Sequence, residues 1–72
     1  MHKNKPWYVY ICDKQGQLYT GITTDLENRI RQHKGKLLYS EEFEDKRLAA
    51  RREKKIKGWR GDKKLELIKG SG

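Results

Sequence analysis

The chain has 72 residues, enough for one domain and near the size at which a single core stabilises a fold only marginally. Eighteen lysines and arginines against ten acidic residues give a formal net charge of +8, which attracts polyanions such as nucleic acid or an anionic membrane surface. No apolar run approaches the length of a membrane span, and the single cysteine, Cys12, excludes an internal disulfide and a cysteine-rich zinc site. The composition therefore favours a small cytoplasmic protein that binds nucleic acid and not a membrane, unless the charge only keeps the surface soluble.

Two strands joined by a short hairpin connection are predicted first. The run 7–12 is rich in β-branched and aromatic residues, and a second such run, 18–23, follows a stretch that contains Gly16. Alternation with a period of two places the aliphatic side chains on one face, which we expect to be the core. The other face is then free for chemistry, and it carries Tyr8, Tyr10, Tyr19 and Gly21.

A helix is predicted over residues 25–34. Thr24 at the N-cap and Glu27 three residues later form a capping-box pattern, and Gly35 is expected to end the helix. At about 100° per residue, one arc of this helix carries two apolar and two basic side chains. They are Leu26, Arg29, Ile30 and His33. An arginine beside a buried stripe points to a function.

The remaining elements each have a start or stop signal. They are a strand within 36–43, a helix from the Asp45 cap to about Lys57 before Gly58, and a last helix that starts at Gly61 or Asp62. The inner sides of the two helices are expected to carry Leu48, Ala49, Ile56, Trp59, Leu65 and Ile68. Glu53 falls within the inner arc of the longer helix. The chain 1–72 is thus predicted to be one α+β domain, a three-stranded antiparallel sheet flanked by helices in the order β-β-α-β-α-α, with flexible ends at 1–6 and 70–72.

Two tyrosine triplets and three helical side chains follow one another along these elements. They are Tyr8-Val9-Tyr10, Tyr19-Thr20-Gly21 with its motif glycine, Arg29 and His33 on the first helix, and Glu53 on the second. This arrangement resembles the GIY-YIG endonuclease family, in particular its small stand-alone bacterial members of the UPF0213 type. The resemblance extends from Trp7 to Ile68.

The resemblance implies a metal-dependent endonuclease that hydrolyses phosphodiester bonds of DNA with a single divalent ion, Mg²⁺ or Mn²⁺. Glu53 would hold the ion, and Arg29 would stabilise the negative charge that grows on the phosphate. Either Tyr10 or Tyr19 would take a proton from the attacking water, because nearby cations favour an ionised phenol. His33 would hydrogen-bond a tyrosine or a phosphate.

Basic side chains around these positions are the expected nucleic-acid contacts. They are Lys34, Lys36, Arg52, Lys54, Lys57, Arg60 and Lys63. In the family a longer glycine- and base-rich stretch separates the first helix from the third strand, whereas here only residues 34–36 lie between His33 and Leu37. The catalytic residues therefore match the family better than the substrate-binding periphery does.

Each candidate also has an ordinary structural interpretation. The tyrosines could be sheet residues, Arg29 could pair with Asp25, and Glu53 could pair with Lys57 at i,i+4. The chain is then an endonuclease, a nucleic-acid-binding module that cuts slowly or not at all on the same scaffold, or an interaction protein without a nucleic-acid role. In every case we expect a monomer without a small-molecule cofactor.

Overall fold

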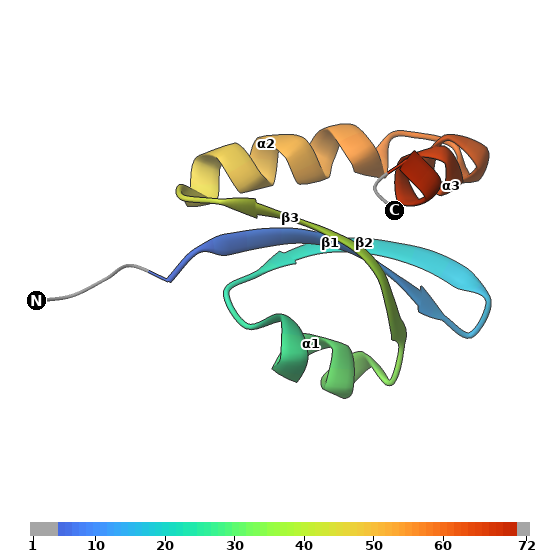
Figure 1. Ribbon diagram of the computed structural model, residues 1–72, viewed down its shortest axis with the longest axis horizontal. Helices are drawn as coiled ribbons and strands as arrows, with labels where there is room; N and C mark the ends of the chain where they lie inside the picture. The colour runs from blue at the N-terminus through green and yellow to red at the C-terminus, as the bar shows by residue number, and fades with distance from the viewer. Residues whose placement is uncertain (1–4, 71–72) are drawn as a thin grey trace, which may run out of the picture.

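The computed structural model describes residues 5–70, apart from the side chain of His33 (Figure 1). The elements are β1 (Trp7–Lys14), β2 (Gln17–Thr23), α1 (Leu26–His33), β3 (Lys36–Phe43), α2 (Lys46–Lys57) and α3 (Gly61–Gly70). Their order and the antiparallel pairing of the strands confirm the predicted α+β fold. Of the ends predicted to be flexible, residues 1–4 and 71–72 lie outside the described part, whereas Gly70 is the last residue of α3.

The sheet has the order β2-β1-β3, so β1 is its central strand. The hairpin between β1 and β2 is tighter than the sequence predicted, because the turn consists only of Gln15 and Gly16. Both residues have positive φ angles, 54° and 84°, which match the twist of the flanking strands. The Asp13 carboxylate fastens this turn by accepting a hydrogen bond of 2.9 Å from the Gly16 N–H. The tight turn fixes the register in which Tyr10 lies opposite Gly21.

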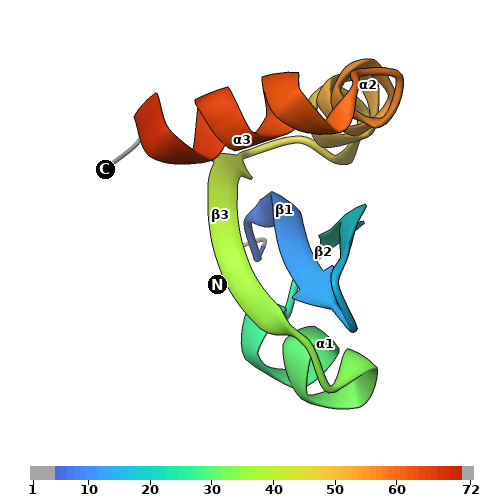
Figure 2. The same cartoon turned by 90° about the vertical axis from the view of Figure 1, so that its right-hand side faces the viewer.

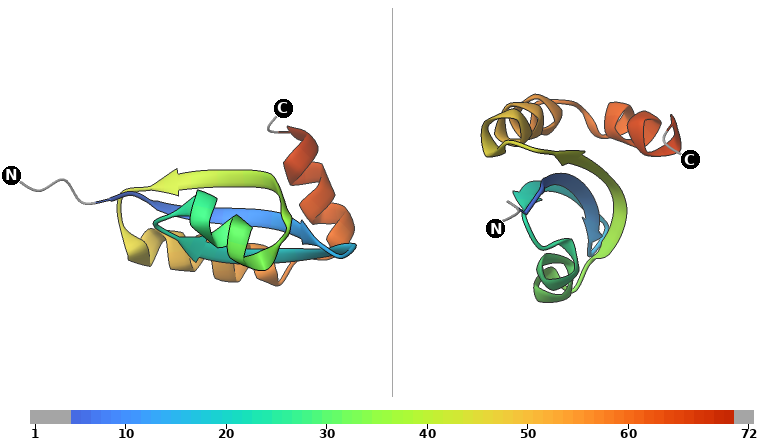
Figure 3. Two further views of the ribbon diagram at one scale, coloured as in Figure 1. Left: turned by 90° about the horizontal axis from the view of Figure 1, so that it is seen from below. Right: turned by 60° about the vertical axis from the view of Figure 1, so that its left-hand side comes forward.

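The helices lie on both faces of the sheet. Figure 2 shows α2 and α3 on one side of the strands and α1 on the other. The right-hand view of Figure 3 shows β3 curving along one edge of the sheet, from the α1 side towards α2 and α3. The opposite edge is β2, an outer strand that α2 also packs against. The β2 edge thus has α2 on one face of the sheet and α1 on the other.

The hydrophobic core lies between the sheet and α2. Val9 and Ile11 of β1 are fully buried against Ala49 and Ile56 of α2, as the alternation in the first strand predicted. Partly buried side chains surround this centre: Trp7, Leu18, Ile22, Tyr39, Phe43, Trp59, Leu67 and Ile68. Leu48 and Leu65 were predicted on the inner sides of their helices, but they are exposed. Ala49 and Ile56 supply the buried face of α2 instead.

The ends of α1 differ by one residue from the predicted ends. Asp25 is the N-cap in place of Thr24, because its carboxylate accepts a 3.1 Å hydrogen bond from the Asn28 N–H. At the other end, Lys34 takes the left-handed conformation (φ 54°) that was expected of Gly35. Gly35 is still required, since a Cβ atom there would lie 2.9 Å from the backbone oxygen of Asp13.

The other predicted helix signals are confirmed. Asp45 caps α2 by accepting a 2.9 Å hydrogen bond from the Arg47 N–H, and Gly58 follows the last residue of that helix. The last helix starts at Gly61. Within residues 5–70, no helix has the length and apolar character needed to cross a bilayer.

Candidate active site

The two tyrosines that sequence analysis singled out lie side by side on neighbouring strands. Tyr10 of β1 and Tyr19 of β2 have ring centroids 6.3 Å apart and planes tilted by 42°. Their depth differs, because Tyr10 is 1% exposed and Tyr19 is 41% exposed. The face expected to be free is therefore partly covered, and α1 packs against its central strand. Of the two phenols, Tyr19 is the one that solvent or a substrate can reach.

Gly21 makes room for the Tyr10 ring. The two residues are direct partners across the β1–β2 ladder. A Cβ atom on Gly21 would lie 2.7 Å from the Tyr10 hydroxyl oxygen and 2.9 Å from its ring carbon Cζ. Such distances are too short for a Cβ atom, so the glycine leaves the space that the Tyr10 phenol occupies beside the edge strand.

The pKa of the Tyr10 hydroxyl is raised to about 12, and burial is the largest cause. The neighbouring groups Tyr19, Cys12 and Glu53 contribute to this rise, while the Arg29 guanidinium opposes it. The expectation that cations would ionise this tyrosine is therefore wrong for Tyr10, because burial outweighs Arg29. Charges carried by both α1 and α2 therefore affect this phenol, although the two helices lie on opposite faces of the sheet.

Arg29 is exposed on α1. Within the described part of the chain it does not pair with Asp25, whose carboxylate accepts the Asn28 N–H as the helix cap. Its guanidinium is thus available to an anion at the surface. His33, predicted one turn further along, belongs to the same helix, but its side chain lies outside the described part.

Glu53 is a partly buried carboxylate with one lysine beside it. Its side chain is 20% exposed, and Lys57 Nζ lies 3.1 Å from Oε2, so the predicted i,i+4 pair is present. No cluster of three or more His, Cys, Asp or Glu residues forms among the described side chains. One accessible carboxylate does not build a closed metal cage. It fits Mg²⁺ instead, which keeps several waters and shares its remaining positions with substrate phosphates.

Six of the seven predicted nucleic-acid contacts are exposed: Lys34, Lys36, Lys54, Lys57, Arg60 and Lys63. Arg52 differs, because its guanidinium binds both carboxylate oxygens of Glu41, at 2.9 and 3.0 Å. It also lies over the Trp59 ring, with Cζ 5.4 Å from the centroid. Arg52 is thus held in a contact between α2 and β3 and is the least available of the seven for a phosphate.

Sequence reasoning missed the cluster around Glu41. The Tyr39 hydroxyl donates to Glu41 Oε2, beside the Arg52 contact. Burial, followed by this hydrogen bond, raises the pKa of Tyr39 to about 12. The only signal in the sequence is the alternation along β3, which places Glu41 on the same face as Tyr39 and Phe43. This alternation does not predict that Arg52, eleven residues further along the chain, binds Glu41.

Comparison with known proteins agrees with the residues and the fold. The GIY-YIG catalytic domain matches residues 6–37, a segment that contains both tyrosines and Arg29. A UPF0213 protein of Staphylococcus saprophyticus is 39% identical over 85% of this chain and 92% of its own length. The chain belongs to the UPF0213 family of small GIY-YIG-like proteins. The UPF0213 protein YhbQ of Escherichia coli is 37% identical over 93% of this chain and 82% of its own length.

A solved structure from the UPF0213 family has the same fold. The solution NMR structure of the UPF0213 protein BH0048 from Bacillus halodurans matches with a TM-score of 0.69 and 31% identity. The match covers 93% of this chain and 86% of that one. The fold similarity therefore extends beyond residues 6–37, the part that the catalytic domain matches.

Proposed function

We propose that this chain is an endonuclease that hydrolyses DNA phosphodiester bonds with a single divalent ion, Mg²⁺ or Mn²⁺. One observation carries the proposal: the sheet sets Tyr10 and Tyr19 side by side, with ring centroids 6.3 Å apart, where the charges of Arg29 and Glu53, from helices on opposite faces, both affect the Tyr10 phenol. The GIY-YIG catalytic domain matched over residues 6–37 supports the same reaction class. The proposal has the chain acting as a single-domain monomer in the cytoplasm, with DNA as its partner.

Arg29 and Glu53 have different roles in this proposal: one would bind the phosphate and the other the metal ion. The exposed Arg29 guanidinium would bind phosphate oxygens, where its fixed charge stabilises the negative charge that grows in the transition state. Glu53 would hold the ion through its partly exposed carboxylate. When bound, the ion polarises the phosphoryl oxygen and stabilises the leaving oxygen. His33, whose side chain lies outside the described part, remains a candidate for a hydrogen bond to a tyrosine or a phosphate.

The two tyrosines have different roles in this proposal. Taking a proton from the attacking water requires a hydroxyl that water can reach, and Tyr19 is 41% exposed. Tyr10 is buried, and burial raises its pKa to about 12, so it stays protonated at neutral pH. We therefore assign the proton transfer to the Tyr19 oxygen. Tyr10 is assigned to positioning, since its ring packs beside that of Tyr19.

A second candidate function is nucleic-acid binding without efficient cleavage. It is favoured by the Lys57 ammonium, which lies 3.1 Å from the carboxylate that the ion needs. The short connection from Lys34 to Gly35 between α1 and β3 also favours it, because it offers little backbone for gripping a substrate. Under this alternative, charge reversals at Lys54 and Lys63 would weaken DNA binding, and loss of Arg29 would change little.

Cleavage of supercoiled plasmid DNA with and without MgCl₂ tests the proposal. Arg29→Ala and Glu53→Gln should each lower the metal-dependent rate about 10²–10³-fold, while DNA binding measured without metal stays within a few-fold of the parent. Matched controls are Arg31→Ala, an exposed arginine of α1, and Glu66→Gln, an exposed glutamate of α3; both should cut at the parental rate. Equal activity of all four variants would contradict the proposal.

A further inference from the structure

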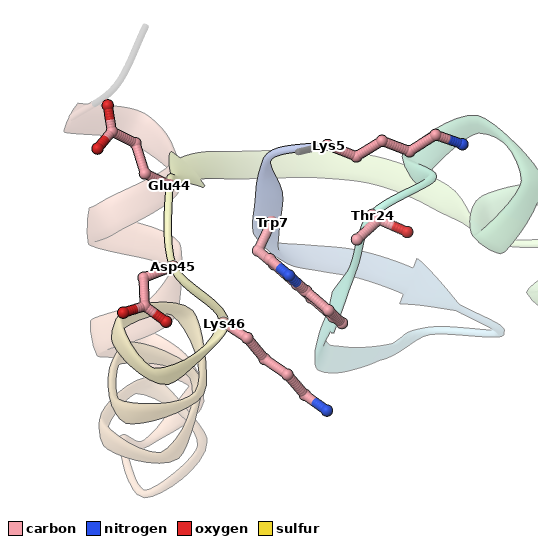
Figure 4. Close-up of a pocket in the computed structure, with 6 residues that line it drawn as sticks. All are labelled: Lys5, Trp7, Thr24, Glu44, Asp45 and Lys46. Atoms are coloured by element: carbon pink, nitrogen blue, oxygen red, sulfur yellow. The ribbon is translucent and has the colours of Figure 1, made fainter. Parts of the chain in front are cut away.

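A hollow with a volume of about 520 Å³ lies at the start of β1. The connections from β2 to α1 and from β3 to α2 meet there, and Figure 4 displays the side chains that line it. They are Lys5, Trp7, Thr24, Glu44, Asp45 and Lys46. The catalytic assignments above use none of these residues. We call this cavity the Trp7 hollow.

The positive and negative side chains around the Trp7 hollow point in different directions. In Figure 4 the ammonium groups of Lys5 and Lys46 point to the side towards which the Trp7 ring extends. The carboxylates of Glu44 and Asp45 point away from that ring, and Asp45 is occupied as the cap that accepts the Arg47 N–H. A ligand that approaches the indole therefore meets two positive charges before it meets a negative one.

The Trp7 indole presents a surface that the core does not fill. It is partly buried against the core, and Lys46 Nζ lies 5.2 Å from its ring centroid. An aromatic ring with cations beside it is the combination that binds unpaired nucleotides, because the base stacks on the ring and the cations pair with phosphates. Stacking tolerates any base, which suits a protein whose net charge of +8 already attracts nucleic acid.

We propose that the Trp7 hollow holds an unpaired nucleotide of a nucleic-acid strand. The base stacks on the Trp7 ring. The Lys46 ammonium moves from its place over that ring to bind a flanking phosphate, and Lys5 contacts a second phosphate. This inference rests on the proposed function only in taking nucleic acid as the partner. The inference narrows that partner to nucleic acid with an unpaired or frayed segment.

The Trp7 hollow lies apart from the tyrosine face of the sheet. Trp7 precedes Tyr10 by three residues on β1, and the alternation of the strand turns the two side chains to opposite faces. Thr24, on the rim, adjoins Asp25, the N-cap of the helix that carries Arg29. A nucleotide bound at Trp7 would thus lie near the start of α1 and not over the Tyr10 phenol.

Tryptophan fluorescence tests this inference directly, since Trp7 and Trp59 are the two tryptophans of the chain. In a Trp59→Phe, Glu53→Gln protein without metal, Trp7 is the sole reporter and no cleavage takes place. Titration with an oligothymidylate should quench Trp7 saturably. The matched protein Trp7→Phe, Glu53→Gln keeps Trp59 as its reporter and should show little quenching. Free thymidine monophosphate at the same nucleotide concentration should quench Trp7 weakly, because it lacks the second phosphate contact.

Affinity measurements give an independent readout by fluorescence anisotropy of the labelled oligonucleotide. Trp7→Ala should weaken binding about 5- to 150-fold, the usual effect of removing the aromatic side chain on which one base stacks. Lys46→Gln should lower the slope of log affinity against log salt by about 0.7, as for one lost phosphate contact on a single strand. Lys69→Gln, an exposed lysine at the far end of α3, should leave both quantities near the parental values. If Trp7→Ala does not fold, the fluorescence quenching of Trp7 in the Trp59→Phe, Glu53→Gln protein tests the inference by itself.

Three results would overturn the inference. The oligonucleotide binds but Trp7 emission does not change; Trp59 is quenched as strongly as Trp7; or the mononucleotide quenches Trp7 as well as the oligonucleotide does. Metal-dependent cleavage without Trp7 quenching would reject the Trp7 hollow and leave the proposed function standing. Trp7 quenching in a protein that never cuts would reject the endonuclease and keep the hollow as part of a binding module.

Discussion

Tyr10 and Tyr19 are neighbours with identical side chains, yet the fold gives them different chemistry. Tyr10 belongs to the central strand and is 1% exposed, so that burial above all raises its pKa to about 12. Tyr19 belongs to the edge strand and is 41% exposed. A motif with two tyrosines therefore contains one buried phenol and one accessible phenol.

The contact between Gly21 and Tyr10 can be tested with the smallest possible change. Gly21→Ala places a methyl group 2.7 Å from the hydroxyl oxygen and 2.9 Å from Cζ of the buried Tyr10 ring, so the ring has to shift. We expect the free energy of unfolding to fall by about 1–3 kcal/mol, as overpacked sites usually do. Urea denaturation measures the effect. Gly61→Ala is the control, because a Cβ there meets no atom within 4 Å and should leave stability nearly unchanged. Equal stability of the two variants would contradict the packing described for Tyr10.

In the proposed site, the Lys57 ammonium would compete with the ion for the Glu53 carboxylate. Lys57→Gln removes that competitor, and i,i+4 pairs on a helix contribute about 0.3–0.5 kcal/mol. We therefore expect Mn²⁺ to bind about twofold more tightly without DNA, as measured by isothermal titration calorimetry. Lys54→Gln, an exposed lysine on the same helix, should not change the affinity as much. Weaker Mn²⁺ binding in the Lys57 variant alone would count against Glu53 as the ligand.

At the scale of elements, the Glu41–Arg52 contact fastens α2 to β3. The two hydrogen bonds have the ordinary lengths of 2.9 and 3.0 Å, and both side chains are partly buried, with 20% of Glu41 and 27% of Arg52 exposed. Burial alone would raise the pKa of Glu41. Hydrogen bonds from Arg52 and Tyr39, together with the Arg52 charge, nevertheless hold it below its ordinary value.

This contact makes stability depend on pH in a predictable direction. Because the pKa of Glu41 is lower in the folded chain, its contribution is complete above the unfolded pKa, about 4.3, and is lost as pH falls through the folded value. Glu41→Gln should lower the free energy of unfolding at pH 7 by about 1–3 kcal/mol, with a smaller difference from the parent at low pH.

Glu42→Gln is the control for the Glu41 variant, since Glu42 is the next residue of β3 and is exposed. Urea denaturation from pH 7 to pH 3 measures all three proteins. A pH-independent deficit in Glu41→Gln would mean that its carboxylate charge does not stabilise the fold.

Most of the elements could be predicted because their signals are local. The alternating pattern of β1 and β2, the Asp45 cap and Gly58 all work within a few residues, and they lie where the sequence placed them. The cap of α1 was misplaced because Thr24 and Asp25 are both good N-cap residues, and only the turn geometry selects Asp25. The exposure of Leu48 was missed because helical periodicity alone does not say how wide the buried face of the helix is.

At the scale of the whole molecule, the candidate site could be predicted only in part. The order of the tyrosines, Arg29 and Glu53 is a property of the sequence, and it pointed to the family to which the chain belongs. The burial of Tyr10 and the capture of Arg52 by Glu41 were not predictable, because both depend on contacts between elements distant in the chain. Long-range packing thus determines which members of the motif are accessible.

The central claim is that Arg29 and Glu53 act together at one site, although they lie on helices at opposite faces of the sheet. A double-mutant cycle on metal-dependent DNA cleavage, with Arg29→Ala, Glu53→Gln and the combined variant, measures this most directly. Residues that act as a unit are strongly non-additive, so the combined variant should cut about as slowly as the slower single variant. If the two losses multiply, or if neither change slows cleavage, Arg29 and Glu53 do not share one catalytic site.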